Sequence, residues 1–271
     1  MRKFSLLLTA LALVFSASGA SATPANNPIT NGLVAAYEFS GNANDVSGNG
    51  NDGVVNGATL TTDRFGNANS AYSFDGSQSI VSDVSSTNFE TTNGITLSAW
   101  IHVDSTNDWN HVVSGLGATG SVYSTLRPGN VLELRPQIEN DNGITWLITG
   151  ATTTSTDWLH VAVTWSGGSE VDATNFFLDS IAYPSVIESS QGTVSPPFSI
   201  QQLFMGLRFG TQGVEGQPLS GRLDDVYVYN RVLSSAEIAT LYFAVPEPNT
   251  ALLLGVGMMG LGMRRRARRG C

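Results

Sequence analysis

The stretch Gly221-Arg222-Leu223-Asp224-Asp225-Val226-Tyr227-Val228-Tyr229-Asn230-Arg231 decides the fold. Its apolar residues predict a strand, and successive side chains of a strand point to opposite faces. Asp224 and Asp225 are therefore expected on opposite faces, where they cannot share one role. Asp224 falls on the face that carries valines, so its carboxylate needs a partner. One face is expected to hold Leu223, Asp225, Tyr227 and Tyr229, and the other Asp224, Val226 and Val228.

Short segments of similar strand character recur along the chain, separated by Gly, Asn, Asp and Ser clusters that favour turns. No internal repeat is apparent, and helical periodicity is nearly absent. The exception is Ser234-Ser235-Ala236-Glu237-Ile238, where Ser234 and Glu237 form a capping box for one short helix ending near Tyr242. The predicted strands are Leu33 to Phe39, Ala71 to Phe74, Ile95 to His102, Ile144 to Ile148, Leu159 to Trp165, Phe176 to Ile181 and Leu223 to Tyr229.

The part of the chain between the two terminal segments, here called the body, has the composition of an exported β-rich domain. Its strong negative charge argues against anionic partners. The chain has 13 basic and 22 acidic residues. Leaving out Arg2, Lys3, the five C-terminal arginines and Glu247 leaves 6 basic and 21 acidic residues, so the body carries a net charge of about −15. Nucleic acid and anionic membranes need Lys and Arg patches, so both are excluded as partners, whereas cations and neutral or cationic glycans stay compatible. The only cysteine is Cys271, so the body can form no disulfide and no thiolate metal site.

The N-terminus has the features of a signal peptide. Met1-Arg2-Lys3 is a basic start, Phe4 to Phe15 is an apolar run, and Ala20-Ser21-Ala22 is a small-residue site for signal peptidase. We expect residues 1–22 to be removed, although a single N-terminal membrane helix is the alternative. Either arrangement places the body outside the cytoplasm.

The C-terminal residues 244–271 have a three-part order. Val245-Pro246-Glu247-Pro248 leads into an apolar segment, residues 250–263, and five arginines follow between Arg264 and Arg269. Such a segment stops in a bilayer with its arginines on the cytoplasmic side, and it is only marginally long enough to span. The order resembles the PEP-CTERM sorting signal, which implies an exosortase-type transpeptidase as partner and a transient anchor in the inner membrane before release to the cell surface or matrix. An ordinary tail anchor or a buried C-terminal helix is the alternative.

Several segments of the body resemble LamG-like jelly-roll domains when taken in order. The resemblance implies an all-β, concanavalin A-like sandwich of two antiparallel sheets over residues 23–243, with a short terminal helix. It also implies that Trp100 and the strand from Trp158 to Trp165 lie in or near the core. The matching segments are Gly32 to Phe39, Asp45 to Gly50, Tyr72 to Gly76, Ile95 to Ile101, Trp158 to Trp165 and Gly221 to Arg231.

A structural calcium is expected at Asp224. In related jelly-roll domains the first Asp of the closing strand meets a calcium near the first strand, and Asp224 matches that position. Calcium takes six to eight oxygen ligands, so the loop from Asp45 to Asp52 is the expected second contributor, through Asp45. The alternative is that Asp224 accepts backbone hydrogen bonds and that Asp45 caps a turn.

Catalytic motifs are incomplete. Laminarinase-type glycosidases of this fold carry Glu-x-Asp-x-x-Glu, and the nearest match, Glu170-Val171-Asp172-Ala173-Thr174-Asn175, ends in an amide. A retaining hydrolase needs two carboxyl groups, so no catalytic residue is expected. The histidines His102, His111 and His160 show no zinc-binding spacing and no nucleophile elbow is present, although counting alone leaves a Ser-His-Asp triad open.

A glycan site needs exposed rings beside polar groups, because sugar C–H surfaces stack on aromatic faces. Trp109 lies in the polar loop Asn107-Asp108-Trp109-Asn110, so Asp108, Trp109 and Asn110 are the predicted ligand-binding residues; the alternative for Trp109 is a loop anchor. Trp146 and Tyr123 lie on predicted strands, where they either line the concave sheet or lie in the interior. We therefore predict an exported, non-catalytic carbohydrate-binding or adhesion domain, with exopolysaccharide or another glycan as its candidate ligand. The alternatives are a structural or protein-interaction domain and a glycoside hydrolase on the same fold.

Overall fold

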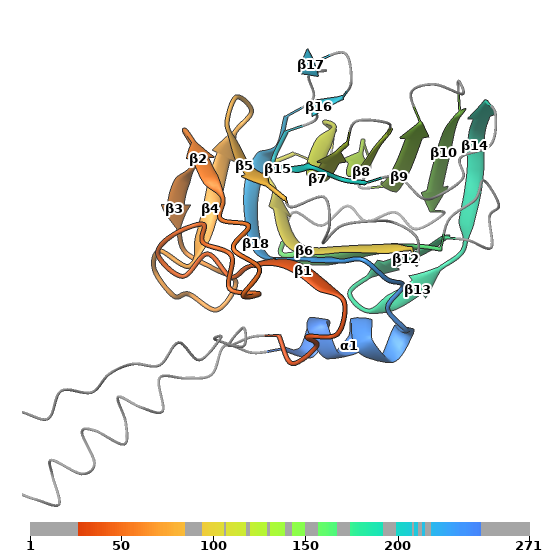
Figure 1. Ribbon diagram of the computed structural model, residues 1–271. Helices are drawn as coiled ribbons and strands as arrows, with labels where there is room; N and C mark the ends of the chain where they lie inside the picture. The colour runs from red at the N-terminus through yellow and green to blue at the C-terminus, as the bar shows by residue number, and fades with distance from the viewer. Residues whose placement is uncertain are drawn as a thin grey trace, which may run out of the picture.

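The computed structural model describes residues 27–84, 94–105, 107–117, 120–128, 131–138, 143–149, 157–166, 174–191, 199–207, 209–210, 213–214 and 218–244. Two large antiparallel sheets face each other, and one helix packs on the outside of one of them (Figure 1). The sandwich predicted from sequence is confirmed. The predicted signal peptide, the sorting tail and most of the Glu170 to Asn175 segment lie outside the described residues. No helix in the described part of the chain is long and apolar enough to cross a membrane.

Sheet A carries the first and last strands of the domain and has the order β13-β12-β11-β6-β18-β4-β3, with β1 also paired to β18. The long strand β18 pairs with β6 on one side and with β1 and β4 along the other. Its strands are β1 (Leu33–Tyr37), β3 (Thr59–Thr61), β4 (Ala71–Asp75), β6 (Ile95–Val103), β11 (Leu159–Trp165), β12 (Thr174–Leu178), β13 (Ile181–Tyr183) and β18 (Ser220–Tyr229).

Sheet B has the order β14-β10-β9-β8-β7-β15-β5-β2 and covers the other side of the core. Its strands are β2 (Val54–Asn56), β5 (Ser79–Asp83), β7 (Asn110–Leu116), β8 (Gly120–Arg127), β9 (Val131–Ile138), β10 (Gly143–Thr149), β14 (Ser185–Gln191) and β15 (Gln202–Met205). A separate two-stranded hairpin is formed by β16 (Phe209–Gly210) and β17 (Gly213–Val214). Each of the seven segments predicted as strands overlaps a strand of one of these sheets.

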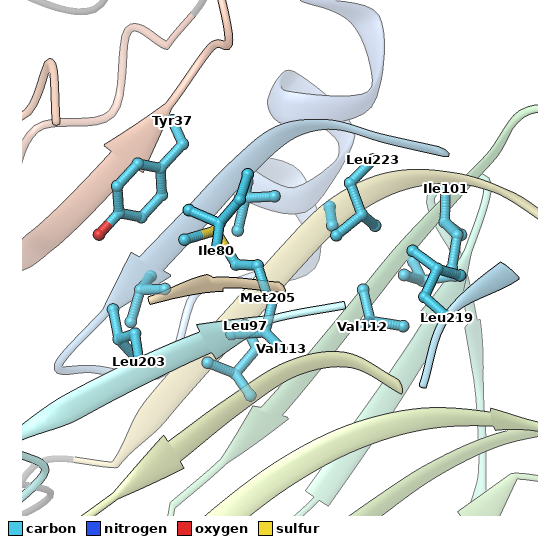
Figure 2. Close-up of a cluster of buried hydrophobic side chains, with 14 of the residues drawn as sticks. Tyr37, Ile80, Leu97, Ile101, Val112, Val113, Leu203, Met205, Leu219 and Leu223 are labelled. Carbon is cyan, nitrogen blue, oxygen red and sulfur yellow. The ribbon is translucent and has the colours of Figure 1, made fainter. Parts of the chain in front are cut away.

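The main core lies between the sheets. Leu97 of β6 and Leu223 of β18 come from sheet A, and Val113 and Leu203 come from sheet B (Figure 2). Each such side chain contributes roughly 1.5–3 kcal/mol when it is fully removed from water. Because 32 buried residues join in this one cluster, a cysteine-free domain of this size has a core large enough to hold it together.

Strand β18 departs from simple alternation, which corrects the predicted assignment of faces. The pairing of β18 with β6 shifts register between Asp224 and Tyr227, and Asp225 adopts a left-handed φ of 45°. This bulge adds one residue to the strand and reverses the faces beyond it. Leu223, Val226 and Val228 therefore all point into the main core, while Tyr227 and Tyr229 point away from it.

A second, smaller apolar layer lies on the outer face of sheet A. The helix α1 (Ser235–Phe243) covers this face below β1 and β18 (Figure 1). Its Ile238 and Leu241 pack against Tyr227 and Tyr229. Ser234 is the N-cap and exchanges hydrogen bonds with Glu237, so the predicted capping box is confirmed. The helix carries the chain back over sheet A and ends beside the site described next.

Candidate functional site

The outer face of sheet A holds a buried group of three charged side chains. Arg64 Nη1 donates to Asp224 Oδ2 over 2.6 Å, and Arg64 Nη2 lies 2.7 Å from Asp225 Oδ2. All three side chains are at most 5% exposed. The prediction that the two aspartates cannot share a role is wrong, because the bulge at Asp225 turns both carboxylates to the same guanidinium.

Next to this group is an open pocket of about 720 Å³. A pocket of this size falls within the range of small-molecule sites, which is about 300–1,000 Å³. Strands β6 and β18 supply its floor, and the last residues of α1 supply one wall. The lining residues are Arg64, Phe65, Trp100, His102, Asp157, Trp158, Asp179, Arg222, Tyr242, Phe243 and Ala244.

Aromatic rings make up much of the lining. Trp100 stacks on Tyr242 with ring centres 5.4 Å apart and planes 19° apart, and Arg64 lies over the Trp100 ring at 4.5 Å. Trp158 meets the His102 ring edge-on at 5.8 Å. Trp100 and Trp158 are both half-buried, whereas Trp165 is fully buried. The expectation that Trp100 lies in the core is therefore corrected: it points outward from β6 into the pocket.

Three lining residues have buried polar atoms with no hydrogen-bond partner in the described structure. They are Arg64 Nε, Trp100 Nε1 and His102 Nδ1. Leaving a buried donor unpaired costs about 1–3 kcal/mol, so such groups are rare in native proteins. All three belong to residues that line the pocket, but the atoms themselves are buried beneath its surface.

The histidines near the pocket are neutral at physiological pH. Burial and, to a smaller extent, the positive charge of Arg64 together lower the pKa of His160 to about 3. Burial lowers the pKa of His102 as well, and Arg222 adds to that effect. His160 Nε2 lies 2.9 Å from Ser98 Oγ, but both residues are about 1% exposed and His160 Nδ1 has no partner in the described structure. This Ser–His pair thus lacks both the acid and the access that a catalytic triad needs.

Of the predicted glycan residues, Asp108 and Trp109 directly precede β7 and Asn110 is its first residue, and none of them lines the pocket. Asn110 is buried; its Nδ2 donates to the Asp108 carbonyl at 3.2 Å, and its Oδ1 accepts from Ser220 N at 3.3 Å. Trp109 is half-buried, with the Arg127 guanidinium 5.0 Å from its ring centre. Asn110 is therefore occupied in shaping the loop, and Asp108 is exposed. A ligand role for Trp109 stays a prediction.

The predicted calcium residues are engaged by other groups. Asp45 Oδ1 accepts from Ala36 N and Ser47 N, and its Oδ2 accepts from Ser47 Oγ and Asn51 N. Asp224 is held by Arg64, which supplies the positive charge that an ion would bring. No cluster of three or more His, Cys, Asp or Glu suited to a metal occurs in the described ranges. The donor set therefore does not fit a calcium shared by Asp224 and Asp45.

Sequence reasoning missed most of the pocket. Arg64 is 160 residues away from Asp224 in the chain, and no local pattern links the two. The resemblance places Trp100 and Trp158 in or near the core, because each lies in or adjoins an apolar strand. One signal was available: in Trp100-Ile101-His102 the polar or amphipathic residues alternate with Ile101, which is typical of a strand with one face outside the core.

The two antiparallel sheets define a protein of the concanavalin A-like sandwich class. Residues 74–239 match the concanavalin A-like lectin/glucanases superfamily, and the chain belongs to it. Residues 244–266 match the PEP-CTERM protein-sorting motif, which includes Val245, Pro246, Glu247 and Pro248. That motif implies export, cell-surface sorting and processing by an exosortase. No curated protein matches the chain.

Solved structures share the fold at low sequence identity. Domain 4 of an extracellular arabinanase from Geobacillus stearothermophilus, in complex with arabinotriose, is 16% identical with a TM-score of 0.56, over 78% of this chain and 98% of that one. The binding domain of Paraclostridial Mosquitocidal Protein 1 is 18% identical with a TM-score of 0.58, and 79% of this chain covers 52% of it. The receptor binding domain of a botulinum neurotoxin C/D mosaic serotype is 15% identical with a TM-score of 0.56, and 79% of this chain covers 51% of it. The chain thus spans about half of the two toxin domains.

Proposed function

We propose that this protein is an exported, non-catalytic carbohydrate-binding domain and that its ligand site is the pocket on the outer face of sheet A. The observation that carries the proposal is the pair of half-buried rings, Trp100 and Trp158, that line the pocket together with the polar side chains of Asp157, Asp179 and Arg222. Sugars need this combination, because rings bind their C–H faces and fixed polar groups bind their hydroxyls. The structural similarity to a domain solved with arabinotriose supports the same class of ligand.

The charges around the pocket favour a neutral glycan. Arg222 makes no ion pair with another described residue, while Asp157 and Asp179 bring carboxylates to the same pocket. Such a mixture can donate to and accept from hydroxyl groups without a large net charge. The net charge of about −15 on the body repels polyuronates. Neutral polysaccharides of the cell's own matrix are therefore the proposed ligands.

The absence of catalysis is part of the proposal. The buried Ser98–His160 pair has no acid partner in the described structure and is covered by Tyr242, whose ring lies 5.9 Å from His160. The Glu170 segment lacks its last carboxylate. We expect no reducing ends from purified protein incubated with neutral polysaccharides. Release of reducing ends would instead support the glycoside hydrolase alternative.

We further propose that residues 250–263 anchor the exported chain briefly in the inner membrane, after signal peptidase has removed residues 1–22. Processing by the exosortase then leaves the domain at the cell surface or in the extracellular matrix. The order of the motif, the apolar segment and the arginines supports this route. Loss of the tail from cell-surface material, seen by mass spectrometry, would test it.

Binding is tested by affinity electrophoresis of residues 23–244 through gels that contain arabinan, a neutral β-glucan, alginate or the producing cell's exopolysaccharide. We expect retention by a neutral polymer, weakened about tenfold in Trp158→Ala because a central aromatic contact is lost. Trp109→Ala is the matched control and is expected to leave retention unchanged. Weaker retention in Trp109→Ala alone would move the site to the predicted loop, and no retention by any polymer would favour a structural or protein-interaction domain.

A further inference from the structure

The end of α1 is both a wall of the pocket and the last part of the domain before the sorting motif. Tyr242 stacks on Trp100, and Phe243 meets Tyr242 edge-on at 4.9 Å while remaining 69% exposed. Ala244 follows and also lines the pocket. Val245, the first residue of the motif, comes directly after Ala244. Residues 242–244, here called the stalk, therefore serve two parts of the molecule at once.

Arg64 holds the stalk at its last residue. Its Nη2 donates to the Ala244 carbonyl at 3.2 Å, while the same guanidinium bridges Asp224 and Asp225. Arg64 also lies over Trp100, on which Tyr242 stacks. The guanidinium is nearly buried and fixed by two carboxylates, so it is a rigid anchor point. Two independent contacts, a charge-assisted hydrogen bond and a ring stack, thus keep the stalk on sheet A.

This attachment limits how far the motif can stand away from the domain. An extended chain advances at most about 3.3–3.6 Å per residue. With Ala244 held on the sheet, Val245 and Pro246 lie at most roughly 7 Å from Ala244, and Pro248 at most roughly 14 Å, by the same measure. An enzyme that encloses the first half of the motif therefore has little room for its own backbone and side chains between the motif and the domain.

We propose that the stalk is a clamp on sorting: Tyr242 and Arg64 are positioning residues that hold it on sheet A, and the exosortase acts on the motif only when the stalk has come away. The stalk in contact with sheet A also completes the pocket. Ligand binding and processing by the exosortase therefore depend on the same equilibrium between the attached and the detached stalk, and binding equilibria that share a state are reciprocally linked. A ligand that fills the pocket therefore slows processing. This last consequence rests on the proposed function, whereas the clamp itself does not.

The clamp is tested with the full chain in cells that process it, by pulse-chase measurement of tail loss. Tyr242→Ala removes the ring stack and is expected to speed tail loss by about twofold to tenfold, the range that one aromatic pair corresponds to. Inserting Gly-Ser-Gly-Ser-Gly-Ser between Ala244 and Val245 leaves every described side chain in place and is expected to speed it at least as much. Thr240→Ala, on an exposed position of the same helix, is the control and should process at the wild-type rate.

The decisive comparison combines the two changes. If the clamp operates, Tyr242→Ala adds nothing once the six-residue insertion is present, because the motif is already free of the stalk. An equal acceleration by Tyr242→Ala with and without the insertion would overturn the clamp, since the substitution would then act only through stability. Unchanged tail loss in both single variants would also overturn it. Polysaccharide retention is measured separately, so failure of the glycan proposal is distinguishable from failure of the clamp.

Discussion

Asp224→Asn tests the buried charge group, because two carboxylates share one guanidinium. When both are ionised, Asp224 and Asp225 place two negative charges beside the single positive charge of Arg64, and none of these three side chains is more than 5% exposed. Burial and the neighbouring Asp225 raise the pKa of Asp224 from 3.8 to about 8, against the opposing effect of Arg64. We therefore expect the pair Asp224 and Asp225 to hold a proton in the folded protein at neutral pH.

That proton makes the stability of the domain depend on pH in a defined direction. Between pH 4 and pH 8 the folded state binds a proton that the unfolded aspartate releases, so the free energy of unfolding falls as pH rises. The slope is on the order of 1 kcal/mol per pH unit. His160 acts at lower pH: its depressed pKa gives a contribution that is lost as pH falls below 6.5. The window from pH 6.5 to 8 therefore separates the contribution of Asp224 from that of His160.

Asparagine replaces the protonated aspartate with a neutral group of the same shape and leaves one guanidinium facing one carboxylate. We expect Asp224→Asn to match the wild type only near pH 4, where the unfolded aspartate is also protonated, and to exceed it increasingly as pH rises, by a few kcal/mol at pH 8, with the contribution of Asp224 to the pH slope removed. Urea unfolding of residues 23–244, followed by tryptophan fluorescence at several pH values, measures this. Asp108→Asn, at an exposed position, is the control for a lost carboxylate.

The result that refutes the reasoning is a variant with the wild-type slope between pH 6.5 and 8. A loss of several kcal/mol at pH 8 would refute it as well, because it would show that both carboxylates are ionised and required. Either outcome would mean that Arg64 alone does not set the charge balance of the site.

Three further predictions concern the same region. Arg64→Met leaves two buried carboxylates without a cation and should cost about 3–5 kcal/mol at pH 7 in urea unfolding, with less loss at pH 5; equal losses at both pH values would contradict it. Because Arg64 takes the place of an ion at Asp224, we expect the same melting temperature in calcium and in chelator, and a rise of several degrees in calcium would restore the calcium prediction. Ser234→Ala removes the N-cap of α1 and should destabilise the domain by about 1 kcal/mol, whereas Ser234→Asp should retain most of that stability.

Much of the fold could be predicted from sequence because strands and turns are encoded locally. The apolar segments between Gly- and Asn-rich clusters all overlap strands, and the Ser234–Glu237 box marks the start of α1. What failed was the assignment of faces on β18. A period of two holds only while the strand is regular, and the extra residue at Asp225 reverses every face after it. Nothing in the sequence Asp224-Asp225 distinguishes a bulge from a regular strand.

The pocket could not be predicted because its residues meet only through the sheet. Trp100 and Arg222 lie on the paired strands β6 and β18, Arg64 comes from the chain between β3 and β4, and Tyr242 comes from α1. A tryptophan in an apolar strand is usually interior, but the outer face of sheet A is itself partly covered by a second apolar layer. Aromatic residues are therefore present on both faces of the same strands, and composition does not separate them.

The way the pocket is built places its rigid and movable parts in different elements. The floor belongs to β6 and β18, whose backbones are hydrogen-bonded on both sides within sheet A, so Trp100 and Arg222 are fixed. The wall belongs to the end of a helix, whose last turn carries no basic residue to favour its C-terminus. Free energy of local opening is lowest at such ends. The part of the pocket that opens most readily is thus the part that continues into the sorting motif, and release of the stalk requires no change in the sheets.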